Sequence, residues 1–399
     1  MRKLMYQLSA GIFILTVATN AIADGSIYST RALGVSWYYP GGQAVGMGGV
    51  AISNFDPRHL NWINPAALPA GQAVRFSANF LYQNLETRSK TQSFKTGYAN
   101  FNGAMVSVPV QKRVGIAFGI FPLTNINFKI EKQSTIENYP YTKTVRGTGG
   151  LNSIFLMIGC RPLKSVLVGV SGNFIMGKMD EDWRVDFTSS QLRDSFDQFR
   201  TKAWGMNYGL GFIAEFLPGW RLGGIYSFPS DLHMKFETSY YSPRITTSHS
   251  RTLTYPQKIG VGTSYYWKNR WLLGFDFITQ DWQDFQLSEE NPSETVREYR
   301  YAVGTEFTPS RQTHVFYLKQ ISYRLGFVYS QPYFLGYNGE KLQSYLFTFG
   351  FGLPFAHQRG MLDLGFEIGK MGNLEENMFA EDIFRVTVFI TSGERWFVR

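Results

Sequence analysis

Few residues in this 399-residue chain have the types and spacing of a catalytic, metal or cofactor site. The five histidines are scattered and show no spacing typical of a metal site: His59, His233, His249, His314 and His357. His59 has Asp56 and Ser53 nearby, but this spacing does not match a nucleophile elbow. Gly46 and Gly48 lack the strand–turn–helix context of a dinucleotide fingerprint. We therefore expect no enzyme, no catalytic residue, no metal and no cofactor, and we interpret the single Cys160 as packing.

The charged residues with a regular placement lie within segments that alternate between apolar and polar positions. They are Arg75, Glu215, Asp276, Glu306, Arg324, Asp363, Glu367 and Arg385. A cation facing lipid near the middle of a membrane would cost about 2–4 kcal/mol, so in a membrane barrel these side chains must point inward. They can brace the interior as ion pairs, or one cation can bind an anionic ligand. The cations to test for a ligand carboxylate are Arg75, Arg324 and Arg385.

Strands must position these charges, because the apolar residues recur with a period of two. Between 206 and 216 every even position is apolar, and the positions between them are mostly small or polar. The segment 362–369 alternates in the same way. This period predicts a strand whose two faces meet different environments. In a soluble sandwich the apolar face meets a core, whereas in a membrane barrel it meets lipid.

The N-terminus favours the membrane barrel. Arg2 and Lys3 precede an apolar stretch at 11–18, and 21–23 reads as an A-x-A cleavage site. We predict a signal peptide over 1–23, with the mature chain beginning at Asp24. No later segment approaches the roughly 18 uninterrupted apolar residues of a membrane helix. An exported, strand-rich chain of this kind is expected as an integral protein of a bacterial outer membrane.

Composition and charge agree with this assignment. Aromatic residues make up 17% of the chain and Gly contributes 40 residues, as expected where aromatics form interface girdles and Gly allows close packing. The net charge of +9 could meet nucleic acid, anionic lipid or lipopolysaccharide. No basic run is interleaved with stacking aromatics. We therefore expect contacts with outer-membrane lipid and lipopolysaccharide, and no nucleic acid.

The alternation predicts an all-β fold, a transmembrane antiparallel β-barrel of about 14 strands, as an even number is expected. The strands are predicted near 73–85, 96–109, 113–130, 150–161, 164–177, 202–217, 220–236, 253–267, 270–285, 299–308, 313–330, 344–354, 360–370 and 383–392. Short connections are expected in the periplasm. Longer polar connections are expected outside, at 131–149, 178–201, 237–252, 286–298, 331–343 and 371–382. The stretch 178–201 could hold a short helix or an extended hairpin.

Residues 24–71 do not alternate and are rich in Gly, Ala, Asn and Pro. Short helices and turns suit this segment, with Asn64 as an N-cap and Pro65 at the first helical position. It is too small to fold alone and must lie against or inside the barrel, which is predicted over 72–399.

Several segments, in order along the chain, resemble the FadL/TodX family of outer-membrane transporters for long-chain fatty acids and aromatic hydrocarbons. Asn64-Pro65-Ala66, preceded by Gly46-Met47-Gly48-Gly49, is similar to the family's N-terminal hatch. The other similar segments are 223–229, 256–265, 271–276, 281–285, 301–307, 324–327 and 330–332.

The resemblance implies a barrel plugged by the hatch, in which Asn64, Pro65, Ala66, Gly48 and Gly49 gate the lumen. It also implies passive uptake of a hydrophobic small molecule, such as a fatty acid or hydrocarbon, which leaves sideways through a kinked third strand. That strand contains Phe121 and Pro122, and proline is tolerated in sheets only at edges or bulges. Pro122 marks either this kink or an ordinary bulge near the rim.

The C-terminal segment 393–399 and Glu381 are more similar to relatives in Bacteroidetes-type bacteria. There a FadL-like barrel of the PorV type serves type IX protein secretion and binds partner proteins. This function, with secretion-system proteins as partners, is the alternative to uptake, and a structural barrel without cargo is a third possibility.

Overall fold

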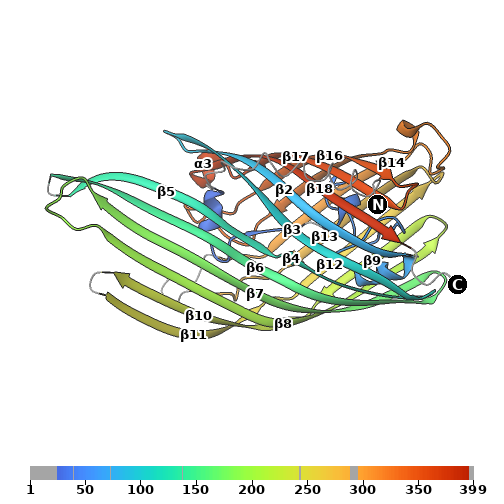
Figure 1. Cartoon of the computed structure of the whole chain (residues 1–399), viewed down its shortest axis with the longest axis horizontal. Helices are drawn as coiled ribbons and strands as arrows, with labels where there is room; N and C mark the ends of the chain where they lie inside the picture. The colour runs from blue at the N-terminus through green and yellow to red at the C-terminus, as the bar shows by residue number, and fades with distance from the viewer. Residues whose placement is uncertain are drawn as a thin grey trace, which may run out of the picture.

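The computed structural model describes residues 25–38, 40–71, 73–136, 138–241, 244–287 and 295–394. Over these residues the chain forms a long antiparallel β-barrel (Figure 1). The predicted signal peptide, 1–23, lies outside the described residues. No helix in the described part of the chain is long and apolar enough to cross a membrane.

The barrel wall has 14 strands, and pairing of the last strand with the first closes it. Three wall strands are each interrupted once, so they carry two labels. In chain order the wall consists of β2 (Val74–Arg88), β3 (Ser93–Gln111), β4 (Val114–Pro122) continued by β5 (Thr124–Ile136), β6 (Tyr139–Leu163), β7 (Val166–Phe187), β8 (Ser195–Leu217), β9 (Trp220–Ser227) continued by β10 (Ser230–Tyr241), β11 (Arg244–Tyr255) continued by β12 (Lys258–Trp267), β13 (Trp271–Gln280), β14 (Glu298–Phe307), β15 (Ser322–Gln331), β16 (Ser344–Phe355), β17 (Gly360–Met371) and β18 (Ala380–Glu394). The predicted fold class and strand number are confirmed.

Strand β8 shows how the alternation builds the wall. Its exposed side chains are large and apolar: Trp204, Met206, Tyr208, Leu210 and Phe212. The side chains between them point inward and are small or polar. The two faces therefore meet lipid and lumen, as expected of an integral outer-membrane protein. The eight charges predicted on polar faces obey the same alternation, and six of them are buried: Arg75, Asp276, Glu306, Arg324, Asp363 and Glu367.

Three of the connections predicted to be loops are strands. The stretches 131–149, 178–201 and 237–252 belong largely to the hairpins β5–β6, β7–β8 and β10–β11. The extended hairpin allowed for 178–201 is therefore the form observed. These hairpins project far beyond the rest of the wall (Figure 1). Water surrounds both of their faces there, so the ladder continues while the apolar alternation that marks a strand is lost.

A further strand begins later than predicted. The predicted strand over 313–330 begins only at Ser322, because the short 3-10 helix η4 (Tyr317–Lys319) lies in the connection before it. The connections at this end of the barrel are 112–113, 164–165, 218–219, 268–270, 308–321 and 356–359. Five of these six are only two to four residues long, and the projecting hairpins lie at the opposite end. We accordingly assign this end to the periplasm.

The N-terminal segment, residues 25–71, contacts inward-facing residues along the whole barrel. It contains η2 (Ile27–Thr30), β1 (Val35–Ser36), α2 (Gly42–Val45) and η3 (Pro65–Ala70). At the extracellular end, near α3 (Leu374–Asn377), the Tyr28 hydroxyl donates to the Phe379 carbonyl at 2.6 Å. At the periplasmic end, a Cβ on Gly115 would lie 2.9 Å from the Leu68 carbonyl oxygen. The segment therefore runs from one end of the barrel to the other.

Candidate ligand-binding site and its charged anchor

A buried charge cluster holds the N-terminal segment near the periplasmic end. Arg324 donates from Nε to Glu306 Oε2 at 2.8 Å and from Nη1 to Asp363 Oδ1 at 2.7 Å. All three side chains are about 1% exposed. Arg324 also donates to the Gly42 carbonyl of the N-terminal segment at 3.3 Å. Arg324, predicted as a ligand cation, is thus already neutralised by two carboxylates of the wall.

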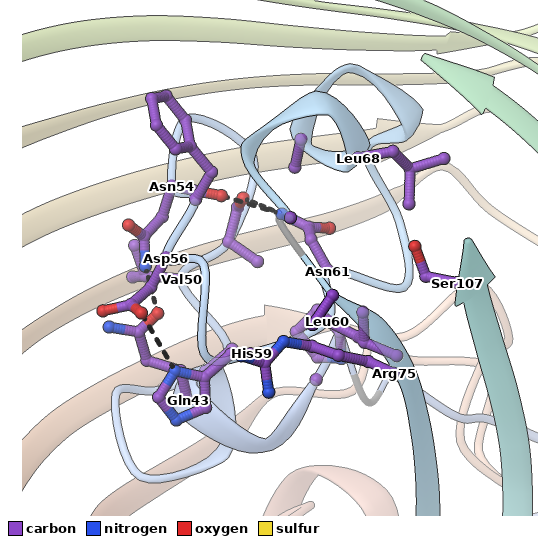
Figure 2. Close-up of a pocket in the computed structure, with 18 residues that line it drawn as sticks. Gln43, Val50, Asn54, Asp56, His59, Leu60, Asn61, Leu68, Arg75 and Ser107 are labelled. Atoms are coloured by element: carbon purple, nitrogen blue, oxygen red, sulfur yellow. Dashed lines mark hydrogen bonds and ion pairs between the residues drawn. The ribbon is translucent and has the colours of Figure 1, made fainter. Parts of the chain in front are cut away.

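The loop 55–59 brings further charges to this cluster. His59 Nε2 lies 3.1 Å from Asp363 Oδ1, and Asp56 pairs with Arg58 at 2.9 Å and with Arg311 at 3.0 Å. Figure 2 shows His59, Asp56 and Gln43 around the small pocket that they line. Taking one partner from such a buried network costs about 3–5 kcal/mol, because the other charge is left uncompensated. The cluster therefore anchors the segment to the wall.

Asn64 has a direct structural role in η3. The Asn64 side chain accepts from the Ala66 amide at 3.0 Å, which makes it the N-cap, with Pro65 following at the first position. Its Nδ2 donates to the Ile52 carbonyl at 2.6 Å. A Cβ on Gly211 would lie 2.1 Å from Asn64 Oδ1, so the glycine in β8 permits this close approach. The predicted N-cap and first-position proline are confirmed.

Gly48 and Gly49 lie in a tight turn against the opposite wall. Their φ angles of +67° and +85° are left-handed, a conformation that only Gly adopts without strain. A Cβ on Gly48 would lie 2.9 Å from the Phe327 carbonyl oxygen. Arg300 donates to the Gly48 carbonyl at 2.8 Å. These residues fix the segment in place, and whether they gate the lumen remains a prediction.

Two adjoining cavities lie inside the barrel, on the extracellular side of the charge cluster around Arg324. The first has a volume of about 120 Å³, and its lining is mainly apolar and aromatic, including Trp62, Phe121, Met157 and Ile175. The second has a volume of about 110 Å³ and is more polar. Both are lined by a shared set of residues: Trp37, Tyr38, Leu123, Tyr255 and Lys258. The pair forms a candidate ligand site with an apolar part and a charged part.

The three predicted ligand cations are not brought together. Arg324 belongs to the charge cluster, and Arg75 lines the small pocket of about 30 Å³ next to it. Only Arg385 lines a cavity of the candidate site, where its Nη1 lies 3.6 Å from Glu367 Oε2. The sequence reasoning missed three charged residues that line the second cavity: Lys258, Glu298 and Arg300. Arg300 lies an even number of residues before Glu306 in β14, so its side chain is on the same inward face. The period of two that placed Glu306 inside could therefore have identified Arg300 as well.

The wall beside the cavities is interrupted in the third strand. Pro122 is the last residue of β4, and Leu123 separates it from β5. Both halves of this strand pair with β6 on one side. On the other side β4 pairs with β3, whereas β5 pairs with the short β1 of the N-terminal segment. Among the described residues no backbone pairing joins 93–103 of β3 to β5. Across this unpaired stretch, Asn125 Nδ2 donates to the Tyr98 hydroxyl at 3.1 Å.

Aromatic side chains fill the inner side of the interruption. Trp37 lies with its ring centroid 6.4 Å from that of Tyr98, and Phe121 lies 5.3 Å from Phe155. Both Trp37 and Phe121 line the first cavity. The cavity, the end of β4 and the unpaired wall are therefore neighbours.

A family model named BamG matches the chain over residues 1–399. The chain belongs to the BamG family. No curated protein matches it. Among solved structures, a FadL homologue of Pseudomonas aeruginosa is similar at 13% identity and a TM-score of 0.60, covering 90% of this chain and 99% of the other. These values show a shared fold.

Two toluene transporters have the same fold as this BamG family member. TbuX of Ralstonia pickettii is 14% identical with a TM-score of 0.58, covering 87% of this chain and 96% of its own. TodX of P. putida is 14% identical with a TM-score of 0.59, covering 91% and 100%. The barrel is therefore FadL-like, and it belongs in the bacterial outer membrane.

Proposed function

We propose that this protein lets small hydrophobic molecules cross the outer membrane by passive diffusion. The observation that carries the proposal is the apolar cavity, which lies beside the unpaired wall between β3 and β5. A hydrophobic molecule has no reason to cross a water-filled pore, whereas an opening at this place would let it move from the lumen into lipid. Two barrels of the same fold are described as toluene transporters, which supports this class of cargo.

The cavity volumes favour a compact cargo. An engineered apolar cavity of about 150 Å³ binds benzene. The first cavity, of about 120 Å³, is close to that size. A single aromatic ring would nearly fill it, whereas a long-chain fatty acid would need both cavities and a rearrangement of the residues between them. We therefore favour a monoaromatic hydrocarbon over a fatty acid.

In this mechanism the N-terminal segment acts as a hatch and the break after Pro122 acts as the exit. Asn64, Pro65 and Ala66 hold η3 against the wall, and the turn at Gly48 and Gly49 holds the opposite side. Trp37 closes the lumen side of the gap near Tyr98. A small shift of the segment would move Trp37 and join the cavity to the gap.

Toluene uptake into proteoliposomes that hold the purified mature protein tests the proposal. Ser171 lines the first cavity. Ser171→Leu places a larger apolar side chain there and should abolish most of the protein-dependent uptake. Val170→Leu, at the neighbouring lipid-facing position, is the matched control and should leave uptake unchanged. Equal uptake by the two variants would contradict a route through the cavity.

A second variant tests the hatch. The double substitution Asn64→Ala with Pro65→Ala removes the N-cap and its pre-set backbone. We expect a barrel that is still folded, judged by its electrophoretic shift on heating, with altered uptake. Unchanged uptake in a folded barrel would count against gating by these residues.

A second candidate function is the binding of a partner protein, and the projecting hairpins favour it. Strand β6 has 25 residues, although about 9–11 residues suffice to cross a membrane. The projecting part carries polar pairs such as Arg200 with Asp180 at 2.9 Å, and Lys143 stacks over the Trp183 ring at 4.2 Å. A secretion-system subunit is one such partner. Shortening the β5–β6 and β7–β8 hairpins should release a stoichiometric partner without affecting uptake if this function holds.

A further inference from the structure

A groove of about 770 Å³ opens at the periplasmic mouth of the barrel, away from the two cavities. The β8–β9 turn, the β12–β13 turn, the β14–β15 connection and the loop at Phe55 and Pro57 surround it. The charged side chains that line it are Arg221, Lys268, Arg270 and Arg311 against Glu215 and Asp56. Asp56 is already bound by Arg58 at 2.9 Å. The groove is therefore net positive.

The periplasmic connections share this sign. The six connections contain eight Lys and Arg residues and no Asp or Glu: Lys112, Arg113, Lys164, Lys268, Arg270, Arg311, Lys319 and Arg359. Such a one-signed field attracts anionic groups and speeds their encounter with the protein. Three of these basic residues, Lys268, Arg270 and Arg311, line the groove, so there the positive charge surrounds a concave surface.

Arg221 lies inside the groove, where its Nε is 3.8 Å from Glu215 Oε2. Its guanidinium carbon lies 3.8 Å from the centre of the Phe55 ring and 4.5 Å from that of Tyr266. Its Nη1 donates to the Phe55 carbonyl at 3.1 Å. The neighbouring side chains Trp220 and Leu222 are exposed on the lipid-facing side, so Arg221 points into the mouth. The groove thus faces the periplasm and the N-terminal segment, which favours a soluble anionic partner over lipid phosphates.

Arg311 connects the groove to the anchor of the N-terminal segment. Its side chain is 35% exposed, and its Nη1 lies 3.0 Å from Asp56 Oδ2, while its Nη2 lies 3.8 Å from Glu306 Oε1. A carboxylate arriving in the groove would meet Arg311 and compete with Asp56 for it. Binding in the groove and anchorage of the segment are therefore coupled, and such coupling acts in both directions.

We propose that this groove docks an acidic peptide segment of a periplasmic protein, and that docking draws Arg311 away from Asp56. The partner would carry several Asp or Glu residues in an extended stretch. Docking would weaken one tie between the loop 55–59 and the wall. The proposal does not depend on uptake of a hydrophobic cargo, since neither cavity takes part in it.

Binding of a fluorescein-labelled hexaglutamate peptide to the full-length mature protein in detergent tests the docking. The double variant Lys268→Glu with Arg270→Glu should bind the peptide at least about tenfold more weakly, because charge complementarity is lost. The double variant Lys112→Glu with Lys164→Glu changes the same charge on two turns outside the groove and should bind nearly as well as the unchanged protein. Equal loss in both variants would overturn the proposal, since the basic rim alone would then explain binding.

Two further measurements complete the test. Asp56→Asn should bind the peptide more tightly than the unchanged protein, because it frees Arg311, and this gain should be lost in the double variant Asp56→Asn with Arg311→Gln; a gain that persists without Arg311 would overturn the competition for Arg311. Vesicles with and without phosphatidylglycerol form the second arm. Groove-dependent binding to the anionic vesicles, with no binding to the peptide, would assign the groove to lipid phosphates and overturn the protein partner.

Discussion

The two ends of the barrel hold the N-terminal segment by different forces. At the periplasmic end the contacts are ionic, with Arg324, Asp363 and His59 at their centre. At the extracellular end the contacts are mainly apolar: Tyr28 and Leu33 pack in a cluster with Trp282, Tyr333 and Phe334, all nearly inaccessible to water. The buried Glu381 adds hydrogen bonds there, because it accepts from the Ser26 hydroxyl and the Ile27 amide. Ionic contacts respond to pH, whereas apolar packing does not. Within the ionic anchor, Arg311 is the member that a competing anion can reach, because its side chain is 35% exposed.

The connections show the same contrast. Those at the periplasmic end contain only basic charges, as described above. The extracellular connections also carry carboxylates, including Asp281, Asp284, Glu375 and Glu376. Anionic partners are therefore steered to one end of the molecule only.

The largest effect is expected from Arg324→Met. The substitution leaves Glu306 and Asp363 buried without their shared cation, which should destabilise the folded protein by about 3–5 kcal/mol. Thermal unfolding in detergent measures the change. Arg270→Met, at an exposed periplasmic turn, is the control and should change stability little. A similar small change for both would mean that the cluster is not an anchor.

Leu33→Ala tests the apolar end. Leu33 is fully buried in the extracellular cluster, so its truncation should cost about 2–5 kcal/mol through lost contacts and a cavity. The loss should be independent of pH, in contrast to the loss in Arg324→Met, which leaves two titratable carboxylates without their cation. Leu318→Ala, at an exposed position, serves as the comparison. A pH-dependent destabilisation in Leu33→Ala would break the distinction between the two ends.

The fold could be predicted from the sequence because lipid on one side and lumen on the other impose a strict period of two. The same rule placed Glu306, Asp363 and Arg324 inside. It could not say that these three would meet, because they come from β14, β17 and β15 and only the register of the closed barrel joins them.

The period of two failed to predict strands in the parts of the wall that lie outside the membrane. Beyond the membrane both faces of β6 and β7 meet water, so the strands there lack a sequence signal. The cavities are invisible for another reason: they are lined by Trp37 and Trp62, which lie in the N-terminal segment that has no alternation. The interruption after Pro122 was indicated by proline alone, and the pairing of β1 with β5 beside it could not be predicted from the alternation.

The ionic anchor should depend on pH through His59. Burial lowers the pKa of His59, but the carboxylates of Asp363 and Asp56 raise it by more, so the net shift is upward from 6.5. Arg324 Nη2, 3.3 Å from His59 Nε2, opposes this shift without reversing it. A raised folded-state pKa stabilises the protein fully below the unfolded value, and this stability is lost as pH rises through the folded value.

Melting temperature as a function of pH measures this contribution. We expect the folded protein to lose stability above about pH 6.5, the ordinary pKa of histidine. His59→Gln should flatten the profile over this range. His357→Gln, on an exposed periplasmic turn, should leave it unchanged. A profile that is the same in the protein and in His59→Gln would exclude His59 as the group responsible.

The smallest effect is expected in the extracellular hairpins. Arg200 and Asp180 pair at 2.9 Å, but both side chains are partly exposed, at 33% and 23%. Arg200→Ala should therefore cost no more than about 1 kcal/mol, since water and salt screen such pairs. Proteolysis of the hairpins and thermal unfolding both measure it. A loss as large as that of Arg324→Met would mean that charges hold both ends. A small loss would mean that the β7–β8 ladder supports itself, which leaves its charged side chains available to a partner protein.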